Sequence, residues 1–149
     1  MKNQSVCIIG IGNILRTDDG VGAFIVQAIE NKKLKNVFCL TEQQLQIELL
    51  EEACKYSVVI IVDAAVQEKD MVFKKLNNIE TAFQPASHYV NAEMFAALAK
   101  QLYQKETAFY YCGIKGKNFE LGEQISSEIL QLANEAVDII TGFISKLYE

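Results

Sequence analysis

The chain has 149 residues, of which 50% are hydrophobic and 22% charged, with 8 glycines and 1 proline. This composition is that of an ordinary globular domain, and it excludes a disordered or fibrous protein. The 19 acidic and 14 basic residues give a formal net charge of −5, which argues against a nucleic-acid partner because such a partner requires a positive face.

Apolar runs and segments of helical periodicity alternate along the whole chain. The runs predict strands at Ser5–Gly10, Val37–Leu40, Ser57–Asp63, Met71–Leu76 and Thr107–Cys112. Apolar residues at helical spacing predict helices over Gly20–Asn31, over Leu45–Lys55, after a cap at Asn91 and after a cap at Ser126. The third strand is continuously apolar and is expected at the centre of a sheet, covered on both faces. The fourth is shorter and more polar, and is expected at an edge.

The order of these elements defines the fold class. A β-α-β-α-β-β-α-β-α pattern predicts α/β architecture: a single domain, residues 1–149, with a five-stranded, mainly parallel, twisted sheet and helices on both faces. In such sheets, ligands bind beyond the carboxyl ends of the strands, near the point where the strand order switches. Candidate functional residues are therefore expected at that edge.

Membrane and disulfide signals are weak. No segment reaches the roughly 20 apolar residues of a membrane-spanning helix, and the N-terminus is interpreted as a first strand, not a signal peptide. The cysteines have no CxxC spacing, which argues against a zinc site; they are Cys7, Cys39, Cys54 and Cys112. We expect a reduced, cytoplasmic protein without a membrane partner. The sequence does not predict its oligomeric state.

A glycine turn follows the first strand, in the stretch from Gly10 to Gly22. A dinucleotide fingerprint needs a third glycine where this chain has Leu15, and acids at the start of the next helix would repel a pyrophosphate. These features argue against a nucleotide-dependent enzyme. Asp18 and Asp19 are also typical helix-capping residues, and with two acids one can cap while the other faces the cleft.

Two more candidates follow other predicted strands. Asp63 ends an apolar strand, where an acid is also typical of a strand that meets solvent. His88 is the chain's single histidine and lies in a predicted loop, where an exposed histidine is typical. Together with Asp19 they form an oxygen and nitrogen set that suits a divalent ion such as Ni²⁺ or Zn²⁺ and leaves positions open for substrate. Pairing of the first and third strands would bring the two acids together, whereas the sequence does not place His88 beside them.

The stretch from Gly10 to Gly22 reads GIGNILRTDDGVG, which resembles the N-terminal signature of the NiFe-hydrogenase maturation endopeptidases. Further matches to that family follow in order along the chain, at Val62–Ala64, Ser87–His88, Gly113–Ile114, Phe119–Glu123 and Ile125–Glu128. Glu42–Leu49 instead departs from the acidic, double-glycine loop of many members. It is similar to the branch often linked to soluble hydrogenases, which leaves the role of Glu42 open.

This resemblance implies an endopeptidase that removes the C-terminal extension of a hydrogenase large-subunit precursor after nickel insertion. It implies that Asp19, Asp63 and His88 are the catalytic and metal-contacting residues, with Asp18 a neighbouring acid. The nickel is supplied by the precursor as the recognition element, and other divalent ions can occupy the site. Whether an acid or the ion activates water stays open. Gly10, Gly12, Gly20 and Gly22 are expected to let the backbone approach the peptide closely.

A non-enzymatic assembly chaperone that binds nickel or the precursor is the alternative, because the same three residues would serve it. Only a protease shortens the precursor, so exposure to nickel-loaded precursor separates the two functions.

Overall fold

The computed structural model describes residues 4–77, 91–103 and 106–149. Its strands form one sheet of five in the order β2-β1-β3-β5-β4, with the bounds β1 Val6–Ile11, β2 Val37–Glu42, β3 Val58–Ala65, β4 Met71–Lys75 and β5 Ala108–Lys115. β1 pairs in parallel with β2 and β3, and β3 pairs in parallel with β5. β4 is antiparallel to β5 and lies at the edge. The predicted mainly parallel sheet and its polar edge strand are confirmed.

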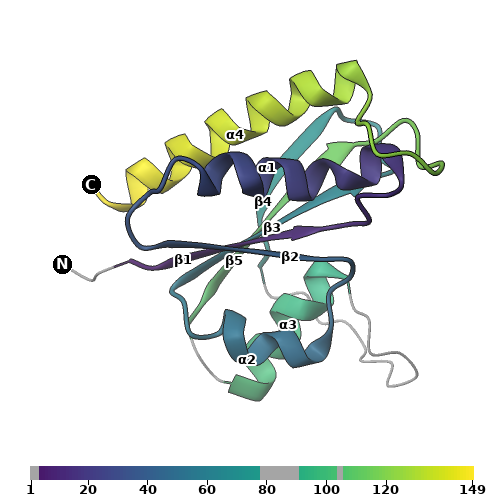
Figure 1. Cartoon of the computed structure of the whole chain (residues 1–149). Helices are drawn as coiled ribbons and strands as arrows, with labels where there is room; N and C mark the ends of the chain where they lie inside the picture. The colour runs from purple at the N-terminus through teal and green to yellow at the C-terminus, as the bar shows by residue number, and fades with distance from the viewer. Residues whose placement is uncertain (1–3, 78–90, 104–105) are drawn as a thin grey trace.

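Helices cover both faces of this sheet, as predicted (Figure 1). α1 (Val21–Glu30) and α4 (Ser127–Leu147) lie on one face, and α2 (Leu50–Ala53) and α3 (Ala92–Tyr103) on the other. Successive residues of a strand point to opposite faces, so the apolar run of β3 contributes to two cores. Val58 and Ile60 pack with α1 and α4, whereas Val59 and Ile61 pack with α2 and α3.

Local signals explain where the two long helices after the third strand begin. The Asn91 side chain accepts a hydrogen bond from the Met94 amide at 2.8 Å, which confirms it as a helix cap. Ser126 holds the N-cap position of α4, as predicted, but its side chain makes no capping hydrogen bond to that helix. The apolar stripe of α4 is fully buried at Ile129 and Ile140, and burial of each such side chain contributes roughly 1.5–3 kcal/mol.

Most predicted boundaries agree with the structure to within two residues, and two differences have a clear physical reason. The helix expected over Leu45–Lys55 is only a 3-10 turn, η2 (Ile47–Leu49), followed by α2, because Gln46 has an extended backbone (φ −122°, ψ 150°) that prevents an earlier start. The loop expected from Gly113 to Gly122 begins later, because β5 continues in register with β3 as far as Lys115.

Gly10 and Gly22 face each other where α1 crosses the sheet. A Cβ atom on Gly10 would lie 2.6 Å from the Gly22 carbonyl oxygen, and one on Gly22 would lie 2.7 Å from the Ile11 oxygen. The missing side chains let the helix approach β1 closely. Helix packing therefore accounts for these two glycines, and their close approach to a substrate peptide stays a prediction.

Within the described residues, no helix combines the length and apolar character needed to cross a bilayer. All four cysteines lie in the described part of the chain, and none of them takes part in a disulfide bond.

Candidate active site

The pairing of β1 with β3 sets the position of the first candidate acid. Ile11, the last residue of β1, is the register partner of Asp63 on β3. Because the two strands are parallel, the chain that leaves β1 starts its turn beside Asp63. The sheet extends from β1 to β2 on one side and to β3 on the other. The switch point of the strand order therefore lies between β1 and β3, and α/β sheets bind ligands at such points.

Asp19 lies on the 3-10 turn η1 (Thr17–Gly20) that follows β1. Its carboxylate accepts a hydrogen bond from the Asn13 amide at 2.7 Å, which holds it against the end of β1. The chain turns at Gly12, where φ is +140° and a Cβ atom would lie 2.0 Å from the Asp19 carbonyl oxygen. Only glycine fits this position, so Gly12 also faces the protein's own backbone.

The structure brings Asp19 and Asp63 together, as the strand pairing predicts. Burial raises the pKa of the Asp63 carboxyl, and the negative charge of Asp19 raises it further; the hydrogen bond from the Ala64 amide only partly opposes them, and the pKa is about 7. Two acids held in this way favour the binding of a proton or a cation between them. A carboxyl that titrates near neutral pH in a cleft is also typical of a functional site.

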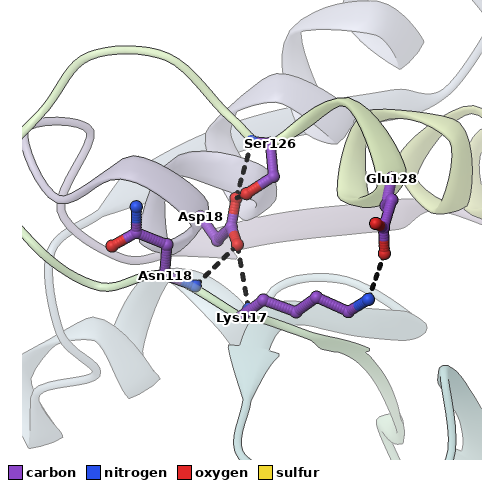
Figure 2. Close-up of polar contacts among 5 residues, drawn as sticks. All are labelled: Asp18, Lys117, Asn118, Ser126 and Glu128. Atoms are coloured by element: carbon purple, nitrogen blue, oxygen red, sulfur yellow. Dashed lines mark hydrogen bonds and ion pairs between the residues drawn. The ribbon is translucent and has the colours of Figure 1, made fainter.

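The Asp18 carboxylate instead contacts the loop after β5 and the start of α4 (Figure 2). Its side chain is fully buried. One carboxylate oxygen accepts hydrogen bonds from the amide and the hydroxyl of Ser126, at 2.8 and 2.7 Å. The other accepts from the amides of Lys117 and Asn118, each at 2.9 Å. Burial alone would raise the pKa of Asp18, but these hydrogen bonds outweigh it and lower the pKa below its ordinary value of 3.8.

Asp18 thus fastens η1 to the loop after β5 and to the start of α4. The interpretation of Asp18 and Asp19 as caps of the first helix is wrong, because the N-cap residue of α1 is Gly20 and no side chain caps it. Ser126 holds the N-cap position of α4, but its hydroxyl donates to Asp18. The ion pair of Lys117 with Glu128 beside it is exposed, and such pairs contribute little.

A pocket of about 390 Å³ opens next to Asp63, on the face of the sheet covered by α2 and α3. Its polar lining, besides Asp63, consists of Gln44, Asn91, Glu93 and Tyr111. The volume is in the range of small-ligand pockets. Burial, the charge of Asp63 and that of Glu93 together raise the pKa of Tyr111, so its hydroxyl keeps its proton at neutral pH.

Comparison with known proteins supports the resemblance that the sequence shows. No protein-family model matches the chain. A protein of Methanocaldococcus jannaschii with the name "Putative hydrogenase maturation protease" is 26% identical over 156 residues, which cover 98% of this chain and 100% of the relative. The similarity to the hydrogenase maturation endopeptidases is therefore confirmed, and it supports a peptidase, as the sequence predicts.

Solved structures of this family share the fold. The hydrogenase maturating endopeptidase HybD from E. coli superposes with a TM-score of 0.74 at 19% identity, covering 96% of this chain and 93% of that one. HycI from Thermococcus kodakarensis superposes with a TM-score of 0.74 at 21% identity, covering 95% of this chain and 93% of that one. They confirm the predicted α/β class over nearly the whole chain.

His88, the third predicted site residue, lies outside the described residues. Among the residues that are described, no group of three or more histidine, cysteine or acidic side chains is placed to hold a metal ion. The set of Asp19, Asp63 and His88 as metal-contacting and catalytic residues therefore stays a prediction. Glu42 lies at the end of β2, where its carbonyl accepts a hydrogen bond from the Gly12 amide, and its side chain is exposed.

A cysteine nucleophile has little support in this structure. Burial raises the pKa of both Cys7 and Cys112 to about 12, and that of Cys39 to about 11. Such thiols hold no useful fraction of thiolate at neutral pH.

Proposed function

We propose that this endopeptidase removes the C-terminal extension of a NiFe-hydrogenase large-subunit precursor after nickel has been inserted. The nickel held by the precursor is the recognition element, and Asp19, Asp63 and His88 contact it. The pairing of Asp19 with Asp63 at the switch point of the sheet is the observation that carries the proposal.

Electrostatics support recognition of a cation by this pair. Two neighbouring carboxylates repel each other, which is part of why Asp63 has its pKa near 7, and an arriving cation removes that repulsion. With the His88 imidazole, the pair offers two oxygen ligands and one nitrogen ligand, which suit Ni²⁺ or another divalent ion. Three protein ligands leave positions open, so we expect weak binding of the free ion and tighter binding of a nickel-loaded precursor.

Hydrolysis of a peptide bond also needs a group that moves a proton. A general base works best when its pKa lies close to the working pH, and Asp63 meets this condition before an ion binds. A bound cation lowers the pKa of its carboxylate ligands. Two routes therefore fit the proposed site: an acid that has released the ion accepts the proton of the attacking water, or the nickel polarises the carbonyl of the peptide bond. The four cysteines form no disulfide bond, which fits a reducing compartment, so we place this reaction in the cytoplasm.

The test is a mass measurement of a large-subunit precursor, loaded with nickel or free of it, before and after exposure to the protein. We expect shortening of the nickel-loaded form only. His88→Ala is expected to abolish shortening with little change in thermal stability, because the sequence predicts a loop at His88 and a loop residue contributes little to a core. Asp138→Ala changes an exposed acid on α4 and is the matched control.

Two results would contradict the proposal. Equal cleavage of the nickel-free precursor would remove nickel as the recognition element. Stable binding of the nickel-loaded precursor without any change in its mass would favour the assembly chaperone.

A further inference from the structure

The phenol ring of Tyr111 lies along β5 toward the candidate active site. A Cβ atom on Gly113 would lie 2.7 Å from Cε2 of the Tyr111 ring and 3.0 Å from its hydroxyl oxygen. The ring therefore covers the place where a side chain of residue 113 would be. A glycine at this position of the strand is what makes room for it.

The register of the sheet brings this hydroxyl to Asp63. Gly113 is the register partner of Asp63, and Tyr111 is that of Ile61, on adjacent parallel strands. Partners in register point to the same face, and so do residues two apart on a strand. The Tyr111 side chain and the Asp63 carboxyl thus share one face of the sheet, and both line the 390 Å³ pocket.

The hydroxyl is a half-buried donor without a described acceptor. The side chain of Tyr111 is partly shielded from solvent, and its hydroxyl donates no hydrogen bond to any residue within 4–77, 91–103 or 106–149. Half-buried donors usually find a partner, and here the pocket next to Asp63 is where a ligand would supply one.

We propose that Tyr111 is a further catalytic residue, whose hydroxyl donates a hydrogen bond to the carbonyl oxygen of the peptide bond that is cut. This inference rests on the proposed function. In the hydrolysis, the water oxygen bonds to the carbonyl carbon and the carbonyl oxygen gains negative charge. The C–N bond then breaks and the carbonyl re-forms. The hydroxyl of the water stays on the acyl carbon, and the other proton of the water goes to the leaving nitrogen. Tyr111 keeps its own proton and stabilises the charge on the oxygen.

The first test compares Tyr111→Phe with the wild type on nickel-loaded precursor. Phenylalanine fills the same space without the donor, and loss of one donor to a developing oxyanion lowers kcat about 100-fold. We expect a loss of that size with KM nearly unchanged. Tyr110→Phe is the matched control, because Tyr110 lies on the opposite face of β5 and packs against Phe73 and Phe143. It is expected to have the wild-type kcat.

The second test uses Gly113→Ala, which displaces the Tyr111 ring without removing its hydroxyl. In the wild-type background we expect a loss of kcat similar to that of Tyr111→Phe. In the Tyr111→Phe background we expect little further loss, since residues that act together are not additive.

Several outcomes overturn the proposal. A wild-type kcat in Tyr111→Phe overturns it and leaves the proposed function intact. A rise in the KM of Tyr111→Phe with an unchanged kcat has the same consequence. So does a Gly113→Ala replacement that lowers kcat by the same factor in the wild-type and the Tyr111→Phe backgrounds. A shift of the pH at half-maximal kcat in Tyr111→Phe, with the plateau unchanged, would assign the hydroxyl to Asp63 and not to the substrate. If the wild type fails to shorten the precursor, the proposed function fails, and this inference fails with it.

Discussion

The neighbouring residues Asp18 and Asp19 have different roles because their carboxylates contact different segments of the chain. Asp18 is enclosed by four hydrogen-bond donors from Lys117, Asn118 and Ser126 (Figure 2). Asp19 has one described donor, the Asn13 amide, and stands next to Asp63. The first acid therefore stabilises the fold, and the second is available to a ligand.

Replacement of Asp18 by asparagine tests the structural role. An amide cannot accept all four hydrogen bonds, and its NH₂ group would face buried donors, so Asp18→Asn is expected to lower the free energy of unfolding by about 3 kcal/mol. Denaturant unfolding at pH 7 measures it, with Asp138→Asn as the exposed control. Unchanged stability would contradict the role.

The same replacement has a predicted pH dependence. The folded pKa of Asp18 lies below its ordinary value of 3.8, so its contribution is complete above about pH 4 and is lost as the pH falls through the folded pKa. The difference between wild type and Asp18→Asn should therefore shrink in acid. A difference that stays constant to low pH would be evidence against the charge.

The pKa shift of Asp63 is opposite in sign to that of Asp18. Its pKa rises from 3.8 to about 7 on folding, so between these values the folded protein binds more protons and its stability falls as the pH rises. Asp63→Asn removes this cost. We expect it to raise the free energy of unfolding by about 2 kcal/mol at pH 8 and by little at pH 4. The figure at pH 8 is smaller than the free energy that corresponds to the whole pKa shift, because the side chain is partly exposed and solvent screens its charge. Thermal unfolding at the two pH values measures this, and equal effects at both would contradict the raised pKa.

At the scale of elements, the turn from β1 into η1 places Asp19, and Gly12 makes that turn possible. Gly12→Ala would set a Cβ atom 2.0 Å from the Asp19 carbonyl oxygen, at a φ of +140°. We expect a destabilisation of about 3 kcal/mol or more and loss of precursor cleavage.

Gly142→Ala is the matched control for Gly12→Ala. Gly142 lies on α4 with nothing within 4 Å of an added Cβ atom, and alanine in an exposed helix is expected to stabilise by about 1 kcal/mol. Parallel melting curves and cleavage assays compare the two variants. Normal cleavage by Gly12→Ala would show that the turn does not position Asp19.

Local patterns were enough to predict the elements and the meeting of Asp19 with Asp63. Apolar runs define strands such as β3, and the pairing of β1 with β3 is a general feature of these sheets. Contacts between distant segments were not predictable in this way. The donors to Asp18 come from residues about one hundred positions later, whereas the local pattern indicates only that one of Asp18 and Asp19 caps the helix that follows. The position of Tyr111 is likewise not readable from local patterns, because only the register shows that its ring covers Gly113.

In the whole molecule, helices pack on both faces of the sheet. At the carboxyl ends of β1 and β3, the acids Asp19 and Asp63 lie beside the 390 Å³ pocket. The layers support this edge from both sides, through Asp18 and the start of α4 on one face and the α3 pocket residues on the other. The contacts around the site thus stabilise the fold, whereas Asp63 itself lowers the free energy of unfolding at neutral pH. This is the pattern expected of a functional residue.

The central claim is that Asp19 and Asp63 form the site at which a nickel-loaded precursor is cut. It is tested most directly by a time course of the intact mass of that precursor with wild type, Asp63→Asn and Asp138→Asn. The account predicts loss of the C-terminal extension with wild type and Asp138→Asn, and an unchanged mass with Asp63→Asn. Cleavage by Asp63→Asn at the wild-type rate would contradict it.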